Sequence, residues 1–140
     1  MAINFQFEDS KFQFSDLEKV ENWINQTIEN EKCFTGNVTY IFCSDNYLLD
    51  VNRKYLNHDY FTDVITFDYV KNGKISGDIF ISIDRITENA KIFNVSRENE
   101  LLRVMIHGVL HLIGYDDQTD EQEAEIRSKE DFYLNIYNSL

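Results

Sequence analysis

The apolar segment 107–114 (HGVLHLIG) constrains the fold more than any other part of the chain. Its apolar residues predict a helix, and no proline occurs in the chain to interrupt it. Residues four apart lie on one face of a helix, with Cβ atoms roughly 6 Å apart, so the imidazoles of His107 and His111 can bind one ion. Gly114 is expected to end this helix, because a glycine in the left-handed conformation commonly follows the last helical residue. We predict a helix over residues 97–113, capped by Ser96.

The residue best placed to complete a metal site is Asp117, six residues beyond His111. A chain that turns back after Gly114 can present this carboxylate to the ion that the two histidines hold. Two nitrogens and one carboxylate leave a fourth position open, which is typical of a catalytic zinc site. We predict one Zn²⁺ per chain, with His107, His111 and Asp117 as ligands. The carboxylate makes the site less positive than three histidines, which favours tolerance of other divalent ions such as Mn²⁺.

The spacing His-x-x-x-His-x-x-Gly-x-x-Asp resembles the metzincin pattern, in which a glutamate follows the first histidine and the third ligand is histidine. Here Gly108 occupies the position of that general base, which argues against zinc peptidase chemistry. Glycine inside a helix costs about 1 kcal/mol relative to alanine. We therefore expect backbone, substrate or a neighbouring element to approach closely at Gly108.

The motif from His107 to Asp116 matches the signature His-Gly-x-x-His-x-x-Gly-Tyr-Asp-His of the YbeY family, with Asp117 in place of the last histidine. Two further blocks resemble that family in order and separation: residues 62–67 (TDVITF), and 77–79 (GDI) followed by Ser82. The resemblance covers roughly residues 36–117, and the three blocks together are specific.

The resemblance implies a metal-dependent endoribonuclease that cuts single-stranded RNA in ribosomal RNA maturation and in ribosome assembly or quality control. It implies a zincin-like α+β fold in which residues 1–140 form a single domain. The implied partners are ribosomal RNA, the ribosome and candidate ribosome-assembly proteins, with no membrane and no DNA. The family typically has an arginine, thought to contact RNA, where this chain has Leu56.

Three other side chains are candidates near the site, each with an alternative. Arg103 lies four residues before His107 and can reach a phosphate, or it can pair with a neighbour such as Glu100. His58 can donate a proton or contact phosphate in the cleft, or it is a polar loop residue. Asp78 can support a metal-bound histidine, or it orients a turn.

Hydrophobic periodicity predicts the remaining elements. Strands are expected at 3–7, 36–43, 63–70 and 75–83, with an Asn-Gly hairpin turn at 71–74. Helices are expected at 15–30 (with Ser15 in a capping box), 44–56, 84–93 and 119–137. Together they predict a mixed, mostly four-stranded sheet packed with helices, in which the helix after Ser44 connects two parallel strands.

Net charge opposes the simplest picture of an RNA-binding protein. The 25 acidic and 13 basic residues give −12, whereas affinity for the phosphate backbone comes mainly from lysine and arginine. Any RNA surface must therefore be local, or a partner must deliver the RNA.

Cys33 and Cys43 are too few for a disulfide framework, and the N-terminus has no long apolar run, so we expect a cytoplasmic protein.

Two other functions remain open. Two histidines and one carboxylate also form the facial triad of non-haem Fe(II) oxygenases, although helical spacing disfavours that interpretation. The other is a ribosome-assembly factor whose metal is mainly structural and whose turnover is small. The net charge and Leu56 favour this second alternative.

Overall fold

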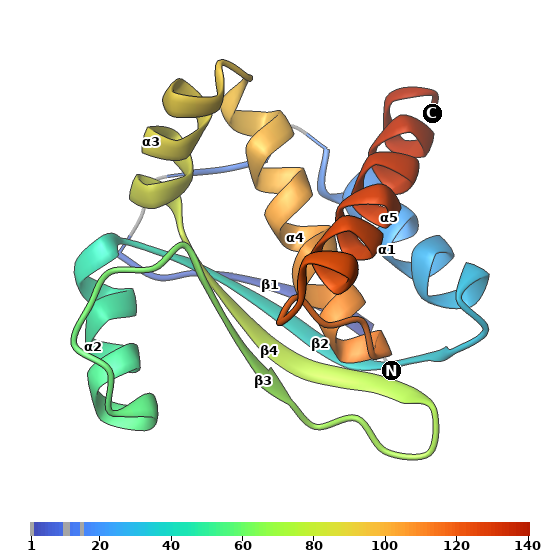
Figure 1. Cartoon of the computed structure of the whole chain (residues 1–140), viewed down its shortest axis with the longest axis horizontal. Helices are drawn as coiled ribbons and strands as arrows, with labels where there is room; N and C mark the ends of the chain where they lie inside the picture. The colour runs from blue at the N-terminus through green and yellow to red at the C-terminus, as the bar shows by residue number, and fades with distance from the viewer. Residues whose placement is uncertain (1, 10–11, 15) are drawn as a thin grey trace.

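Four strands form one mixed sheet, shown in Figure 1. The computed structural model describes residues 2–9, 12–14 and 16–140. The strands are β1 (Ala2–Phe7), β2 (Phe34–Cys43), β3 (Val64–Asp68) and β4 (Lys74–Ser82), in the spatial order β1-β2-β4-β3. β2 pairs in parallel with both β1 and β4, whereas β3 is antiparallel to β4. The predicted α+β class and mixed four-stranded sheet are confirmed.

Helices cover both faces of this sheet. They are α1 (Leu17–Asn30), α2 (Asp45–Leu56), α3 (Ile83–Phe93), α4 (Arg97–Ile113) and α5 (Asp120–Asn138). Because side chains alternate along a strand, Ile79 and Ile81 of β4 join the main core with α1, α3, α4 and α5, whereas Phe80 packs against the smaller cluster under α2. α4 lies between α3 and α5 over the main face (Figure 1). Within the described ranges, no helix has both the length and the apolar character needed to cross a bilayer.

The predicted caps account for most helix boundaries. The Ser44, Ser96 and Thr119 hydroxyls accept from backbone N–H groups at the starts of α2, α4 and α5, and Thr119 forms the full capping box with Gln122. α3 begins one residue earlier than predicted because Ser82 caps it. The predicted cap Ser15 lies outside the described residues. The Asp16 carboxylate accepts from Lys19 N at the start of α1.

The predicted role of the helix after Ser44 is wrong. α2 leads from β2 to β3, which runs antiparallel, and the hairpin then returns the chain to β4 beside β2. The helix that directly joins parallel neighbours is α1, between β1 and β2. A helix can be recognised from its own sequence, but the strand with which its successor pairs depends on long-range contacts.

Gly108 lies where α4 closely approaches the sheet. A Cβ at this position would lie 3.0 Å from Cγ2 and 3.1 Å from Cδ1 of Ile79, which is fully buried on β4. Of the three expected causes for this glycine, the close approach of a neighbouring element is the one found.

Candidate metal centre

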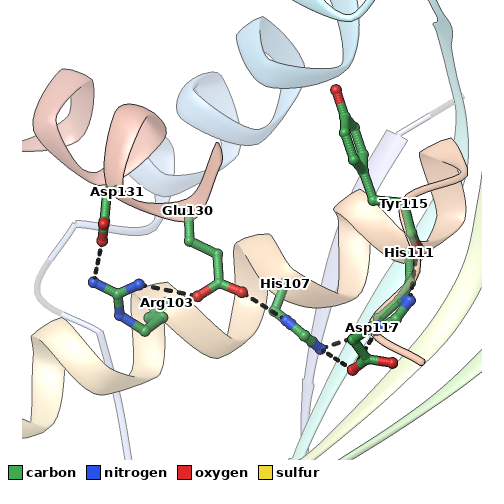
Figure 2. A network of polar contacts seen from close by, with 7 residues as sticks. All are labelled: Arg103, His107, His111, Tyr115, Asp117, Glu130 and Asp131. Carbon is green, nitrogen blue, oxygen red and sulfur yellow. Dashed lines mark hydrogen bonds and ion pairs between the residues drawn. The ribbon is translucent and has the colours of Figure 1, made fainter. Parts of the chain in front are cut away.

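The end of α4 and the loop that follows it bring His107, His111 and Asp117 together. The two histidines lie one helical turn apart on the face of α4 that is not packed into the core. Gly114, with φ of 127°, ends the helix, because this φ is unfavourable for residues with a Cβ. The chain then turns back, and the Asp117 carboxylate reaches both imidazoles (Figure 2).

The distances among the three ligand atoms suit one ion. Nε2 of His107 and Nε2 of His111 lie 3.0 Å apart, and Asp117 Oδ2 lies 3.5 Å and 3.4 Å from them. Zinc binds nitrogen and oxygen at roughly 2.0–2.2 Å, so ligands at tetrahedral angles lie roughly 3.3–3.5 Å from one another. The three residues therefore fit a zinc-sized ion with little rearrangement.

The hydrogen bonds of the other ring nitrogens determine which atoms face this point. His111 Nδ1 lies 2.9 Å from the carbonyl oxygen of Tyr115, and a carbonyl can only accept, so Nδ1 carries the proton. His107 Nδ1 donates in the same way to Glu130 Oε2 at 2.7 Å. When both rings are neutral, two Nε2 lone pairs and a carboxylate oxygen converge within 3.5 Å. Such an arrangement repels itself unless a cation or a proton lies between the atoms.

A chain of polar contacts extends from His107 through Glu130 and Arg103 to Asp131, as Figure 2 shows, and the Asp131 side chain is exposed. Arg103 donates through Nη1 to Glu130 Oε1 at 2.9 Å and through Nη2 to Asp131 Oδ1 at 2.7 Å. Burial disfavours the charged form of His107, but the hydrogen bond to Glu130 and the charges of Glu130, Asp117 and Asp63 outweigh it and raise the pKa of His107. The Glu130 side chain is only 5% exposed, and the hydrogen bonds from Arg103 and His107 satisfy its two oxygens.

Tyr115 anchors the loop that carries Asp117. Its ring points away from the three ligands (Figure 2), and its hydroxyl donates to Glu31 Oε1 at 2.6 Å. Tyr133 also donates to Glu31, and Lys129 lies 3.3 Å from the same carboxylate. Burial raises the pKa of Glu31, but the hydrogen bonds from Tyr115 and Tyr133 and the charge of Lys129 outweigh it, so the pKa is lowered overall.

Two adjoining hollows meet at the ligands. One, of about 560 Å³, is lined by all three ligands and by residues at the start of β3. The second, of about 360 Å³, lies along α4 toward α3 and α5. Asp63 lines both. Burial is the largest influence on this carboxyl group and raises its pKa, although backbone hydrogen bonds and the charge of His107 act in the opposite direction.

The other candidates from the sequence lie in different surroundings. Arg103 forms ion pairs with Glu130 and Asp131 of α5, not the predicted pair with a near neighbour of its own helix such as Glu100. His58 is an exposed loop residue, whose Nδ1 lies 3.0 Å from the Tyr60 hydroxyl. Asp78 accepts from the Tyr69 hydroxyl at 3.2 Å and forms no hydrogen bond with a histidine in the described ranges.

Sequence reasoning missed Glu130 and gave Asp63 no role. A signal for Glu130 was present: it interrupts a buried stripe of α5 formed by Ile126, Tyr133, Leu134 and Tyr137. A carboxylate on the apolar face of an otherwise charged helix requires a partner. The signal does not name the partner, which lies 23 residues away in the sequence.

Comparison with known proteins places these features in context. A family model described as Endoribonuclease YbeY matches residues 3–138. The chain is 49% identical over 136 residues to a protein of Flavobacterium psychrophilum named Endoribonuclease YbeY, covering 97% of this chain and 96% of that protein. It is 47% identical over 136 residues to the protein of that name from Flavobacterium johnsoniae, covering 97% of each. The solution structure of a Thermotoga maritima protein is similar with a TM-score of 0.71 and 28% identity, over 95% of this chain and 88% of that one.

Proposed function

Because this chain belongs to the endoribonuclease YbeY family, we propose that it is a metal-dependent nuclease that cleaves single-stranded ribosomal RNA. The observation that carries the metal dependence is the convergence of two Nε2 atoms and one carboxylate oxygen within 3.5 Å, with both Nδ1 atoms engaged elsewhere. His107, His111 and Asp117 would hold one Zn²⁺, or another divalent ion in its place.

A bound divalent ion supplies polarisation of a phosphoryl oxygen and a more acidic water. Glu130 and the Tyr115 carbonyl fix the two imidazole rings, so the ligands need little reorganisation. Asp63 lines the hollow beside the ligands, and its raised pKa suits it to accept a proton from the attacking group. No residue among the three ligands is free for that task.

We further propose ribosomal RNA and the ribosome as partners, with action in the cytoplasm. The family name supports an RNA substrate, because it specifies cleavage within an RNA chain. Cys33 and Cys43, both free thiols, are compatible with a reducing compartment.

A second candidate function is ribosome assembly with a mainly structural metal and little turnover. Two observations favour it: the net charge of −12, and the engagement of Arg103 by Glu130 and Asp131, which reduces its availability for phosphate. This alternative predicts metal binding and ribosome association without cleavage.

The deciding experiment measures cleavage of ribosomal RNA by the purified protein, with His111→Ala prepared identically. We expect cleavage by the wild type that is lost on addition of chelator, is restored by Zn²⁺ or Mn²⁺, and is at least 100-fold weaker in the variant, an order-of-magnitude expectation for loss of a ligand. Equal cleavage by both proteins would indicate a contaminating nuclease. Metal binding without cleavage under any of these ions would support the assembly function.

A further inference from the structure

A groove runs along α4 away from the metal centre. The second hollow shares Asp63, Val64, His107 and Asp117 with the hollow at the ligands. It shares Phe93, Glu100, Arg103 and Arg127 with a third hollow of about 260 Å³. The three adjoin along α4, which lies between α3 and α5 in Figure 1. From Asn99 to His111 this path follows roughly 18 Å of helix.

Glu100 is the unusual residue in this groove. It is only 5% exposed and lines both outer hollows, yet its carboxylate forms no hydrogen bond or ion pair with any residue in the described part of the chain. Its oxygens keep a small exposure toward the two hollows, so water or a ligand there, and no described residue, must supply their hydrogen bonds. Burial, followed by the charge of Asp63, accordingly raises the pKa of Glu100. What the site lacks is a hydrogen-bond donor.

The surroundings favour a donor on an organic ligand over a second metal ion. Across the described residues, His107, His111 and Asp117 form the only group of three such side chains close enough to share an ion. The positive charges of Arg103 and Arg127 also act on Glu100, and they would repel a further cation.

Two residues near Glu100 can contact the base and the phosphate of a nucleotide. Phe93 is 59% exposed at the end of α3 and offers an aromatic face on which a base can stack. Arg127 on α5 is exposed and has no hydrogen-bond or ion-pair partner among residues 2–9, 12–14 and 16–140, so its guanidinium is available for a phosphate. Both line the same hollows as Glu100.

We propose that Phe93, Glu100 and Arg127 form a guanosine subsite next to the metal centre, which rests on the proposed function as an RNA-cleaving enzyme. The base stacks on Phe93, the Glu100 carboxylate accepts hydrogen bonds from guanine N1–H and N2–H, and Arg127 binds a phosphate. Guanine fits because it places two N–H donors side by side, matching the two oxygens of a carboxylate. Uracil offers one N–H between two carbonyl groups, and adenine and cytosine place a ring acceptor beside the amino group.

The test measures binding of guanosine and inosine 5′-monophosphates to the zinc-loaded protein by NMR titration. Inosine lacks only the 2-amino group, so the contributions of ribose, phosphate and metal contact cancel in the comparison. We expect the wild type to bind guanosine monophosphate about 10-fold more tightly. The preference should fall below about 2-fold in Glu100→Gln, which lacks the second acceptor oxygen.

Two further variants distinguish recognition of guanine by Glu100 from a general effect of charge and from base stacking. Glu123→Gln removes the same charge from an exposed residue of the same hollow, and it should keep the guanosine preference. Phe93→Ala changes an exposed residue and leaves the core intact, and it should weaken binding of both nucleotides about 10-fold through lost stacking.

Equal binding of the two nucleotides by the wild type, or an unchanged preference in Glu100→Gln, would overturn the subsite. The readout is independent of turnover. A guanosine preference without RNA cleavage would contradict the proposed function and support the subsite. RNA cleavage without that preference would support the proposed function and contradict the subsite.

Discussion

The carboxylate of Glu130 determines how His107 presents its Nε2 to the candidate metal centre. It accepts from His107 Nδ1 at 2.7 Å while its other oxygen accepts from Arg103 at 2.9 Å. A buried carboxylate between two donors holds the ring in one orientation and in one tautomer. This single residue of α5 therefore links the ligand helix to the rest of the site.

We predict that Glu130→Gln lowers the affinity for Zn²⁺ by roughly 10- to 100-fold, the range typical of lost support behind a ligand. The neutral amide accepts a weaker hydrogen bond and no longer favours a single tautomer. Competition with a chromophoric chelator measures the affinity. Asp131→Asn is the control, because it removes the exposed partner of Arg103 and keeps Glu130; its effect should stay within about 3-fold. Unchanged affinity in Glu130→Gln would contradict this role.

At the scale of elements, the packing of α4 on β4 depends on Gly108. The missing side chain lets the helix approach until an added Cβ would meet two atoms of Ile79 at 3.0 and 3.1 Å. Glycine in a helix costs about 1 kcal/mol relative to alanine, and the close packing of α4 on β4 offsets this cost. His107 directly precedes Gly108 in the chain, so this approach also influences how far the candidate metal centre lies above the sheet.

We predict that Gly108→Ala destabilises the protein by about 1 kcal/mol, since overpacking costs about 1–3 kcal/mol and the gain in helix propensity returns about 1. Urea unfolding followed by circular dichroism measures the difference. Ile79→Ala removes both the Cγ2 and the Cδ1 atoms that the new methyl group meets, so the double variant should lose less than the sum of the two single changes. Additive losses would show that the contact does not limit the packing.

At the scale of the whole molecule, Glu31 joins segments that lie far apart in the sequence. Just beyond the last residue of α1, it accepts from Tyr115 in the ligand loop and from Tyr133 of α5, with Lys129 beside it. Its side chain is 9% exposed, so these donors replace the water it has lost. The network ties the loop between Gly114 and Asp117 to the end of α1 and to α5.

This network makes part of the stability depend on pH. The pKa of Glu31 lies below its ordinary value of 4.5, so its contribution is fully present above that pH and is lost as the pH falls through the lowered pKa. We predict that Glu31→Gln reduces the free energy of unfolding by about 1–2 kcal/mol at pH 7. The difference from the wild type should shrink toward pH 3.

Urea unfolding at several pH values tests this expectation. Glu29→Gln changes an exposed carboxylate of the same helix and should alter stability by less than about 0.5 kcal/mol at pH 7. A wild-type advantage over Glu31→Gln that stays constant down to pH 3 would exclude Glu31 as the source.

The net charge of −12 shapes how the molecule meets RNA. Arg127 lines the groove and has no hydrogen-bond or ion-pair partner in the described part of the chain, whereas Arg103 is engaged by two carboxylates. One or two phosphate contacts to single-stranded RNA give a slope of log K against log salt of about −1. We predict such a shallow slope for His111→Ala, which leaves the RNA uncut, in fluorescence anisotropy between about 50 and 200 mM salt. A slope steeper than about −3 would reveal a basic surface outside this groove.

Local patterns in the sequence determined most of the helices and strands and part of the candidate site. The helix under the metal centre, its two histidines, its Gly114 stop and the caps Ser44, Ser96 and Thr119 all depend on residues within about one turn of one another. The mixed sheet followed from strand periodicity and the hairpin turn. The proximity of Asp117 to the histidines followed from the chain reversal after Gly114.

Only the tertiary structure decided the rest. Glu130 behind His107, Glu31 behind the ligand loop, and the pairing of Arg103 join residues separated by 23, 84 and 27 positions. The antiparallel placement of β3, which corrected the role of α2, is likewise a long-range pairing. Hydrophobic periodicity states which face of an element is buried but not what lies against it, because that partner depends on how all the elements pack together.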